Sequence, residues 1–170
     1  MTGANFAQYF KDNVDKVGPM MATDNPDLSA FRKRGGKLVI WHGWSDQLIN
    51  ANGSVDYYNR LVARMGGLAK TQQFARLFMA PGVGHCGGGT GPAPQGQFDA
   101  VVKWVEKGTA PASITAARGT GGGGPFGAPP GATPATPMTR PLCPYPAVAH
   151  YKGKGSTDDA ANFSCAAPTK

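Results

Sequence analysis

Charged residues are scarce in this chain of 170 residues, and acids are the scarcer kind, with 10 Asp and Glu against 17 Lys and Arg. The formal net charge of +7 therefore reflects few acids rather than a dense basic stripe. No zinc-ligand spacing or aromatic RNA-binding motif accompanies it, so we expect no nucleic acid partner. Long apolar runs are also missing, and none approaches the ~18 residues of a membrane-spanning helix. We therefore expect no membrane partner either.

Cysteine is rare as well, with three residues at Cys86, Cys143 and Cys165. An odd number leaves one thiol unpaired if the other two form a bridge. A bridge between Cys143 and Cys165 would close a loop of about 20 residues and contribute roughly 3 kcal/mol. No Cys-x-x-Cys pair occurs, which argues against a zinc ribbon. The first residues have neither the basic nor the apolar region of a secretory signal, so we expect no signal peptide in this chain.

Glycine and proline are abundant, with 25 and 15 residues, and they are unevenly distributed. Residues 119–138 are rich in both and carry no charge, which predicts a long irregular loop. Residues 1–34 are predicted to be an N-terminal arm with a helix over 5–21. Residues 35–118 are predicted to form the core, and residues 139–170 a C-terminal coil. One domain fits the length of the chain.

Strand and helix patterns alternate within the predicted core. A short apolar run at 37–41 predicts a buried strand, and a polar loop and an amphipathic helix near 53–65 follow it. A second strand is predicted at 74–79, again followed by a polar loop and then by a helix near 96–107. This order is typical of an α/β fold with parallel strands. In such a sheet, functional residues lie in the loops beyond the carboxyl ends of the strands.

Each of these two polar loops contains a candidate catalytic residue. Asp46 follows the first strand and His85 follows the second. In an α/β-hydrolase the nucleophile, the acid and the histidine occur in that chain order. The acid orients the imidazole, and the histidine takes the proton of the nucleophile. Asp46 could instead be an ordinary turn or N-cap residue, and His85 a loop histidine without a special role. His42 is interpreted as a structural residue that shapes the first loop.

A nucleophile is not recognisable in the chain. The Gly-x-Ser-x-Gly elbow of α/β-hydrolases is absent, and no serine combines flanking glycines with a preceding apolar strand. The serines considered are Ser29, Ser45, Ser54, Ser113, Ser156 and Ser164. The chain therefore has the pattern expected of the second half of a hydrolase.

Several sequence blocks, in order over most of residues 22–166, are similar to those of one family. They are Asn25-Pro-Asp-Leu-Ser-Ala-Phe31, Gly35-Gly-Lys-Leu38, His42-Gly-Trp-Ser-Asp46, Gly84-His-Cys86, Trp104-Val-Glu-Lys-Gly108 with Ala110-Pro111, Arg140-Pro-Leu-Cys-Pro-Tyr-Pro146 and Asp159-Ala-Ala-Asn-Phe-Ser-Cys165. Together they resemble the C-terminal part of the tannase and feruloyl esterase family. The resemblance implies an α/β-hydrolase fold whose nucleophile-bearing half and lid domain are absent from this chain. It also implies hydrolysis of aromatic-acid esters such as gallates and ferulates, and in some relatives of terephthalate monoesters.

The resemblance implies roles for particular residues. Asp46 corresponds to the acid and His85 to the base of a Ser-His-Asp triad, with the serine outside this chain. In the family, a cysteine before the serine bridges to the cysteine after the histidine. Cys86 would accordingly pair outside the chain, and Cys143 with Cys165. The calcium site of the family lies in the lid, so no cofactor is expected here. Two disulfides imply a secreted or periplasmic parent protein.

Three functional hypotheses follow. In the first, the chain is an esterase fragment that is inactive alone and needs the missing upstream half or a complementing chain. In the second, it is a non-catalytic module or pseudoenzyme that binds aromatic ligands through Trp41 and Trp44. In the third, it is a self-sufficient small hydrolase that uses one of its own serines. A half-sheet exposes an apolar edge, so a chain of the first kind is expected to dimerise or aggregate when alone.

Overall fold

The computed structural model describes residues 2–119 and 136–169, so most of the predicted loop at 119–138 lies outside the described residues. Two parallel strands, β1 (Leu38–Gly43) and β2 (Ala75–Ala80), form the centre of the fold. They pair in register from Leu38 opposite Ala75 to Gly43 opposite Ala80. Helix α3 (Ala51–Arg64) and the short helix α4 (Leu68–Thr71) connect them. The predicted α/β order is confirmed here, with strand bounds shifted by one or two residues.

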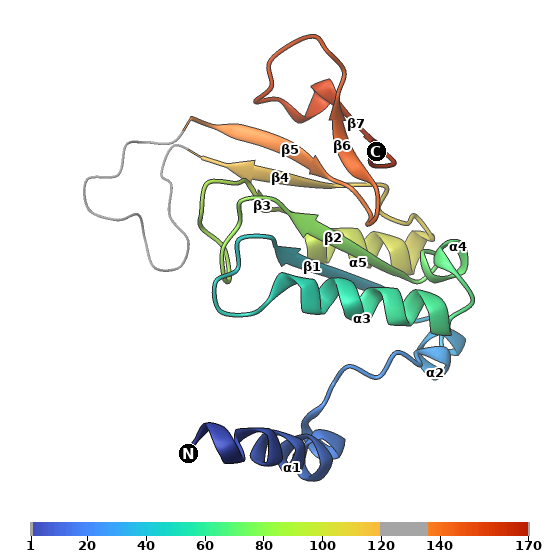
Figure 1. Cartoon of the computed structure of the whole chain (residues 1–170). Coiled ribbons are helices and arrows are strands. Elements are labelled where there is room, and N and C mark those ends of the chain that lie inside the picture. The colour runs from blue at the N-terminus through green and yellow to red at the C-terminus, as the bar shows by residue number, and fades with distance from the viewer. Residues whose placement is uncertain (1, 120–135, 170) are drawn as a thin grey trace.

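Helices cover both faces of this parallel pair (Figure 1). On one face, Tyr58 and Leu61 of α3 pack with Leu77 of β2, and all three are fully buried. Successive side chains of a strand point to opposite faces. Accordingly, the neighbouring Arg76 lies over the ring of Trp104, 5.4 Å from its centroid, and Trp104 belongs to helix α5 (Gln97–Lys107). The result is the helix–sheet–helix layering of an α/β protein.

The C-terminal region is more regular than the predicted coil at 139–170. Strand β5 (Met138–Leu142) pairs antiparallel with β4 (Ile114–Arg118), which also pairs with the short β3 (Ala93–Pro94). Strands β6 (Val148–Tyr151) and β7 (Phe163–Ala166) form a separate hairpin-like pair, with a 3₁₀ turn (Ala160–Asn162) before β7. The prediction of coil is therefore wrong there. These strands were missed because they are short and contain or adjoin prolines. The partner of β5 is also distant in the sequence, on the other side of the glycine- and proline-rich segment.

Hydrogen bonds also connect the C-terminal region to the central sheet and its flanking residues. The backbone N–H of Tyr145 donates to the carbonyl of Leu77 at 2.7 Å, and Gln72 Nε2 donates to the carbonyl of Tyr145 at 3.1 Å. A disulfide joins Cys143, just after β5, to Cys165 in β7. This is the pairing that the resemblance implied. It ties the β6–β7 pair to the rest of the fold.

Replacing both Cys143 and Cys165 by alanine is expected to lower the free energy of unfolding by about 3 kcal/mol, because the open chain gains conformational entropy when unfolded. Urea denaturation of the oxidised protein measures the change. The matched control is Cys86→Ala, which removes an exposed free thiol and should leave the denaturation midpoint unchanged. Equal midpoints for the double variant and the control would contradict the expectation.

Helix α1 (Gly3–Met21) forms where a helix is predicted, but it has no buried residue. In Figure 1 it stands apart from the body of the chain, beyond the extended segment that precedes α2 (Ser29–Lys33). Its exposed apolar side chains recur at helical spacing; they are Phe6, Tyr9, Phe10, Val14, Val17, Met20 and Met21. Most of the stability of a helix in a protein comes from packing of its apolar face, and α1 packs none of its residues in this way. A surface that covers this stripe would stabilise α1. No helix in the described part of the chain has the length and apolar character needed to cross a membrane.

Candidate active site

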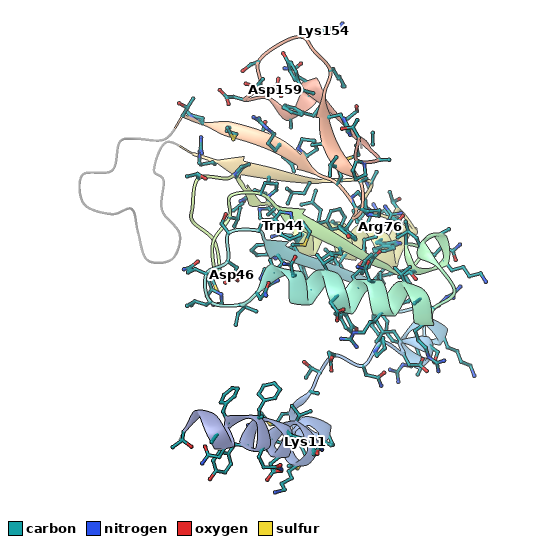
Figure 2. All side chains as sticks on the ribbon, viewed as in Figure 1. Lys11, Trp44, Asp46, Arg76, Lys154 and Asp159 are labelled. Carbon is teal, nitrogen blue, oxygen red and sulfur yellow. A yellow bond between two sulfur atoms is a disulfide. The ribbon has the colours of Figure 1, made fainter. Side chains whose placement is uncertain are left out.

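The two polar loops meet because β1 and β2 are parallel and end at the same edge of the sheet. Gly43, the last residue of β1, lies so close to the second loop that an added Cβ would be 2.2 Å from the Val83 carbonyl oxygen. That carbonyl also accepts a hydrogen bond from the N–H of Ser45 at 3.0 Å. Figure 2 shows Asp46 in the first loop, at the end of the sheet opposite Arg76. A residue without a side chain at position 43 thus permits the two loops to touch.

Asp46 is held firmly in its loop, with a side chain only 6% exposed. Its Oδ1 accepts hydrogen bonds from the backbone N–H groups of Ile49 at 2.8 Å and Leu48 at 2.9 Å. The bond from Ile49, helped by those from Leu48 and the two neighbouring histidines and opposed by desolvation, holds the pKa of Asp46 well below its usual range. The carboxylate is therefore ionised at neutral pH.

His85 lies directly against this carboxylate. Its Nδ1 is 3.1 Å from Oδ2 and 3.2 Å from Oδ1 of Asp46, and its backbone N–H donates to Gln47 Oε1 at 3.3 Å. An ionised carboxylate can only accept hydrogen bonds, so Nδ1 must carry a proton. In the neutral imidazole the lone pair is then on Nε2. Nε2 has no hydrogen-bond partner within residues 2–119 and 136–169. The structure thus brings together the two residues predicted from separate loops.

Two further residues belong to this hydrogen-bonded group, although sequence reasoning did not assign them to the site. His42 Nε2 is 3.1 Å from Oδ2 of Asp46, and His42 Nδ1 is 2.8 Å from Ser54 Oγ. The interpretation of His42 as a loop-shaping residue was incomplete, because it contacts the candidate acid directly. The spacing of four residues between His42 and Asp46 was a weak signal of this contact. Nothing in the sequence indicated Ser54, which is in the first turn of α3.

A cavity of about 340 Å³ opens over the pair. Its lining residues are Trp41, His42, Gly43, Asp46, Ile49, Gly84, His85 and Cys86. Cys86 is an exposed free thiol at a positive φ of 56°. Trp44, proposed with Trp41 as an aromatic-ligand contact, does not line this cavity. A larger cavity of about 500 Å³ lies between β5 and the β6–β7 pair and contains neither Asp46 nor His85.

All six serines lie in the described ranges, and none of their hydroxyls contacts the Asp46–His85 pair. No serine hydroxyl in those ranges is within hydrogen-bond distance of the His85 ring. Ser54 is bound to His42, and Ser29 is bound to Asp27 at the start of α2. The described residues also include no group of three or more His, Cys, Asp or Glu side chains arranged to hold a metal ion. The arrangement can orient an imidazole as a base.

The fold and the site together define an α/β protein with an aspartate–histidine pair at the carboxyl edge of a parallel sheet. A family model described as tannase and feruloyl esterase matches residues 2–166. The chain therefore belongs to the tannase and feruloyl esterase family.

Individual relatives agree with this assignment. The chain is 44% identical over 165 residues to mono(2-hydroxyethyl) terephthalate hydrolase of Piscinibacter sakaiensis, covering 97% of this chain and 25% of that protein. It is 41% identical over 172 residues to a probable feruloyl esterase of Arthroderma benhamiae, covering 98% of this chain and 29% of that protein. The crystal structure of an esterase from Aspergillus oryzae superposes with a TM-score of 0.78 at 32% identity, covering 98% of this chain and 33% of that one. The chain thus spans a quarter to a third of the length of these relatives.

Proposed function

We propose that this chain is the C-terminal part of a serine ester hydrolase that acts on esters of aromatic acids, and that it supplies the acid and the base of the active site. The observation that carries the proposal is the Asp46–His85 pair beside a cavity of about 340 Å³, with a His85 Nε2 that has no partner among the described residues. The family membership supports ester hydrolysis. The feruloyl and terephthalate relatives support an aromatic acyl group.

In the proposed reaction, a serine hydroxyl from the rest of the enzyme attacks the ester carbonyl while His85 Nε2 takes its proton. The resulting imidazolium is stabilised by the ionised Asp46, and it then gives the proton to the leaving alcohol. Water, deprotonated by the same Nε2, then attacks the acyl-serine; the bond to the serine oxygen breaks, the carboxylic acid leaves, and the imidazolium returns the proton to that oxygen. The chain's own residues thus move one proton in each half of the reaction. The hydroxyl and the oxyanion-binding groups come from the segment that bears the nucleophile.

We propose that the segment that bears the nucleophile pairs with the open edge of β1. Among the described residues, β1 pairs only with β2. The N–H of Leu38 donates to the carbonyl of Phe74, and that of Trp44 to the carbonyl of Ala80. Because backbone groups alternate along a strand, the N–H groups of Val39 and Trp41 point to the other, unpaired edge. A strand that pairs there in parallel would have its carboxyl end at the same edge of the sheet as β1 and β2, beside His85.

Two exposed apolar surfaces support the same partner. One is the stripe on α1, and α1 lies within the residues that the family model matches. The other consists of Leu48 and Ile49 beside the candidate site, which are 66% and 56% exposed. Large exposed apolar patches commonly mark interaction sites. We propose that the remaining part of the esterase, whether joined to this chain or separate from it, covers both surfaces.

The proposal extends to the cysteines and the compartment. Cys86 would bridge to a cysteine beside the nucleophilic serine, which would fix the serine close to His85. Together with the disulfide between Cys143 and Cys165, this bridge favours an oxidising location such as the periplasm or the cell exterior for the parent protein. The chain itself requires no cofactor in this scheme.

The test compares the chain alone with the chain combined with the upstream part of the relative from Piscinibacter sakaiensis, either fused or coexpressed. We expect the chain alone to show no labelling by a fluorophosphonate probe and no hydrolysis of methyl ferulate, methyl gallate or mono(2-hydroxyethyl) terephthalate. The combination is expected to be labelled on the upstream serine and to turn over at least one of the three esters. The control is the same combination with His85→Ala.

Three outcomes would contradict the proposal. Labelling of a serine in the chain alone would favour a self-sufficient hydrolase. Binding of ferulate without turnover, even in a folded combination, would favour the non-catalytic ligand-binding module. Equal turnover by the wild-type combination and by the combination carrying His85→Ala would show that His85 is not the base of the reaction.

A further inference from the structure

We propose that His42 is a positioning residue for the Asp46–His85 pair, held in a single tautomer by Ser54. The proposal rests on the function proposed above, because His42 acts through the acid of that reaction. It concerns a hydrogen-bonded chain of four side chains from one helix, one strand and two loops. Its members are Ser54 on α3, His42 on β1, and Asp46 and His85 on the two loops.

The carboxylate of Asp46 determines where the protons of this chain lie. Its Oδ1 accepts from the two backbone N–H groups of the following turn, and its Oδ2 is 3.1 Å from both His42 Nε2 and His85 Nδ1. Since the carboxylate only accepts, both nitrogens must be protonated. In a neutral His42 the Nδ1 atom is then an acceptor, so the Ser54 hydroxyl must donate to it at 2.8 Å. With His42 neutral, every donor direction follows from the carboxylate being an acceptor only.

The chain also links a loop residue to two rigid elements. Asp46 is outside regular structure, whereas His42 is the penultimate residue of β1 and Ser54 is in the first turn of α3. Both His42 and Asp46 are well covered, with side chains 13% and 6% exposed. Sites supported by packed and hydrogen-bonded neighbours hold their geometry better than isolated loop residues. His42 thereby fixes the rotation of the carboxylate, so that both of its oxygens stay within 3.2 Å of His85 Nδ1.

Sharing Oδ2 has a second consequence. The hydrogen bond from His42 takes part of the acceptor capacity of Oδ2, which is one of the two oxygens that His85 Nδ1 contacts. Removing the His42 donor makes Oδ2 a stronger acceptor and favours the imidazolium form of His85. The titratable groups that face His42 are Asp46 and, across the cavity they line together, His85 and Cys86. The pH–rate profile of the assembled enzyme therefore reports on the role of His42.

Two variants of His42 separate positioning from packing. Gln has an amide nitrogen near the place of Nε2 and can still donate to Asp46. Phe fills similar space without a donor. We expect His42→Phe to lower kcat about tenfold with little change in KM, and to move the acid limb of the pH–rate profile to higher pH. His42→Gln should retain most of kcat and the original profile.

The decisive measurement uses the chain by itself and needs no nucleophile. Long-range ¹H–¹⁵N NMR of histidine-labelled protein, recorded as a pH series that reaches the neutral form of His42, should show that form protonated on Nε2 and unprotonated on Nδ1. A low-field signal from the His85 Nδ1–H should be visible in the wild type and in His42→Gln. In His42→Phe its exchange with water should be at least about tenfold faster, the factor expected from losing a supporting hydrogen bond.

The results that would overturn the proposal are equally specific. They are a neutral His42 protonated on Nδ1, or a His85 proton that exchanges at the same rate in all three proteins. A folded His42→Phe with equal kcat and an unchanged pH profile would also overturn it. If the wild-type combination shows no turnover, the proposed function fails, while the NMR comparison still decides the role of His42.

Discussion

Replacing Asp46 by asparagine will lower kcat/KM of the assembled esterase about 10⁴-fold, with the protein still folded. The side chain is 6% exposed, and its Oδ2 receives the Nδ1–H of His85 at 3.1 Å. The asparagine amide can occupy the same space and can donate a hydrogen bond where the carboxylate accepts one. His85 would then accept on Nδ1 and carry its proton on Nε2. That is the wrong tautomer, because Nε2 must receive the proton of the serine.

The measurement is the hydrolysis of methyl ferulate by the combination of this chain with the upstream part of the relative. Asp99→Asn is the matched control, because Asp99 is an exposed acid in the first turn of α5 and contacts neither histidine. The control should keep nearly all activity. A loss of less than about tenfold in Asp46→Asn, far below the effect of removing a triad acid, would show that Asp46 is a turn residue rather than the acid of the reaction.

The ionisation of Asp46 adds a pH signature. Its pKa is held well below the usual range, first by the hydrogen bond from Ile49. A carboxyl group with a lowered pKa in the folded state stabilises that state above its unfolded pKa and loses this contribution as pH falls through the folded value. Thermal unfolding of the wild type should therefore show an acid-dependent loss of stability below about pH 4. Asp46→Asn should show a smaller loss over the same range.

The central part of the fold and its acid–histidine pair could be predicted because both depend on local patterns. Apolar runs followed by amphipathic helices define β1, α3, β2 and α5 without knowledge of distant residues. Asp46 and His85 could be paired because parallel neighbouring strands must end together. The resemblance to an esterase family then implied the roles of acid for Asp46 and base for His85.

The missed features depend on contacts that no local pattern encodes. The strand at Met138–Leu142 exists because it pairs with Ile114–Arg118, so its composition alone suggested coil. The contact between His42 and Ser54 requires the end of β1 to face the first turn of α3, which follows from packing. The sequence pattern predicted the helix α1, but it did not indicate that none of the residues of α1 would be buried.

Replacing Val39 by proline is expected to reduce the activity restored by the upstream segment about 100-fold, while the chain itself stays folded. The N–H of Val39 points to the unpaired edge of β1, because those of Leu38 and Trp44 point to β2. Proline is tolerated on edge strands when the missing N–H faces away from the sheet. A strand that pairs along this edge would lose a hydrogen bond and leave a buried carbonyl unsatisfied, which costs up to about 3 kcal/mol. That cost corresponds to roughly 100-fold in assembly.

The control for this prediction is Val39→Ala, because Val39 also packs against the cluster around Phe78 and Ile114. Alanine loses the same packing but keeps the N–H, so it separates pairing from core stability. Circular dichroism and thermal unfolding of the isolated chains should place the two variants close together, and titration with the upstream segment should separate them. If Val39→Pro assembles as well as Val39→Ala, the nucleophile does not enter along β1. The apolar stripe on α1 would then be the surface to disrupt next, with Phe6→Asp and Phe10→Asp, since its apolar side chains are exposed in the described fold.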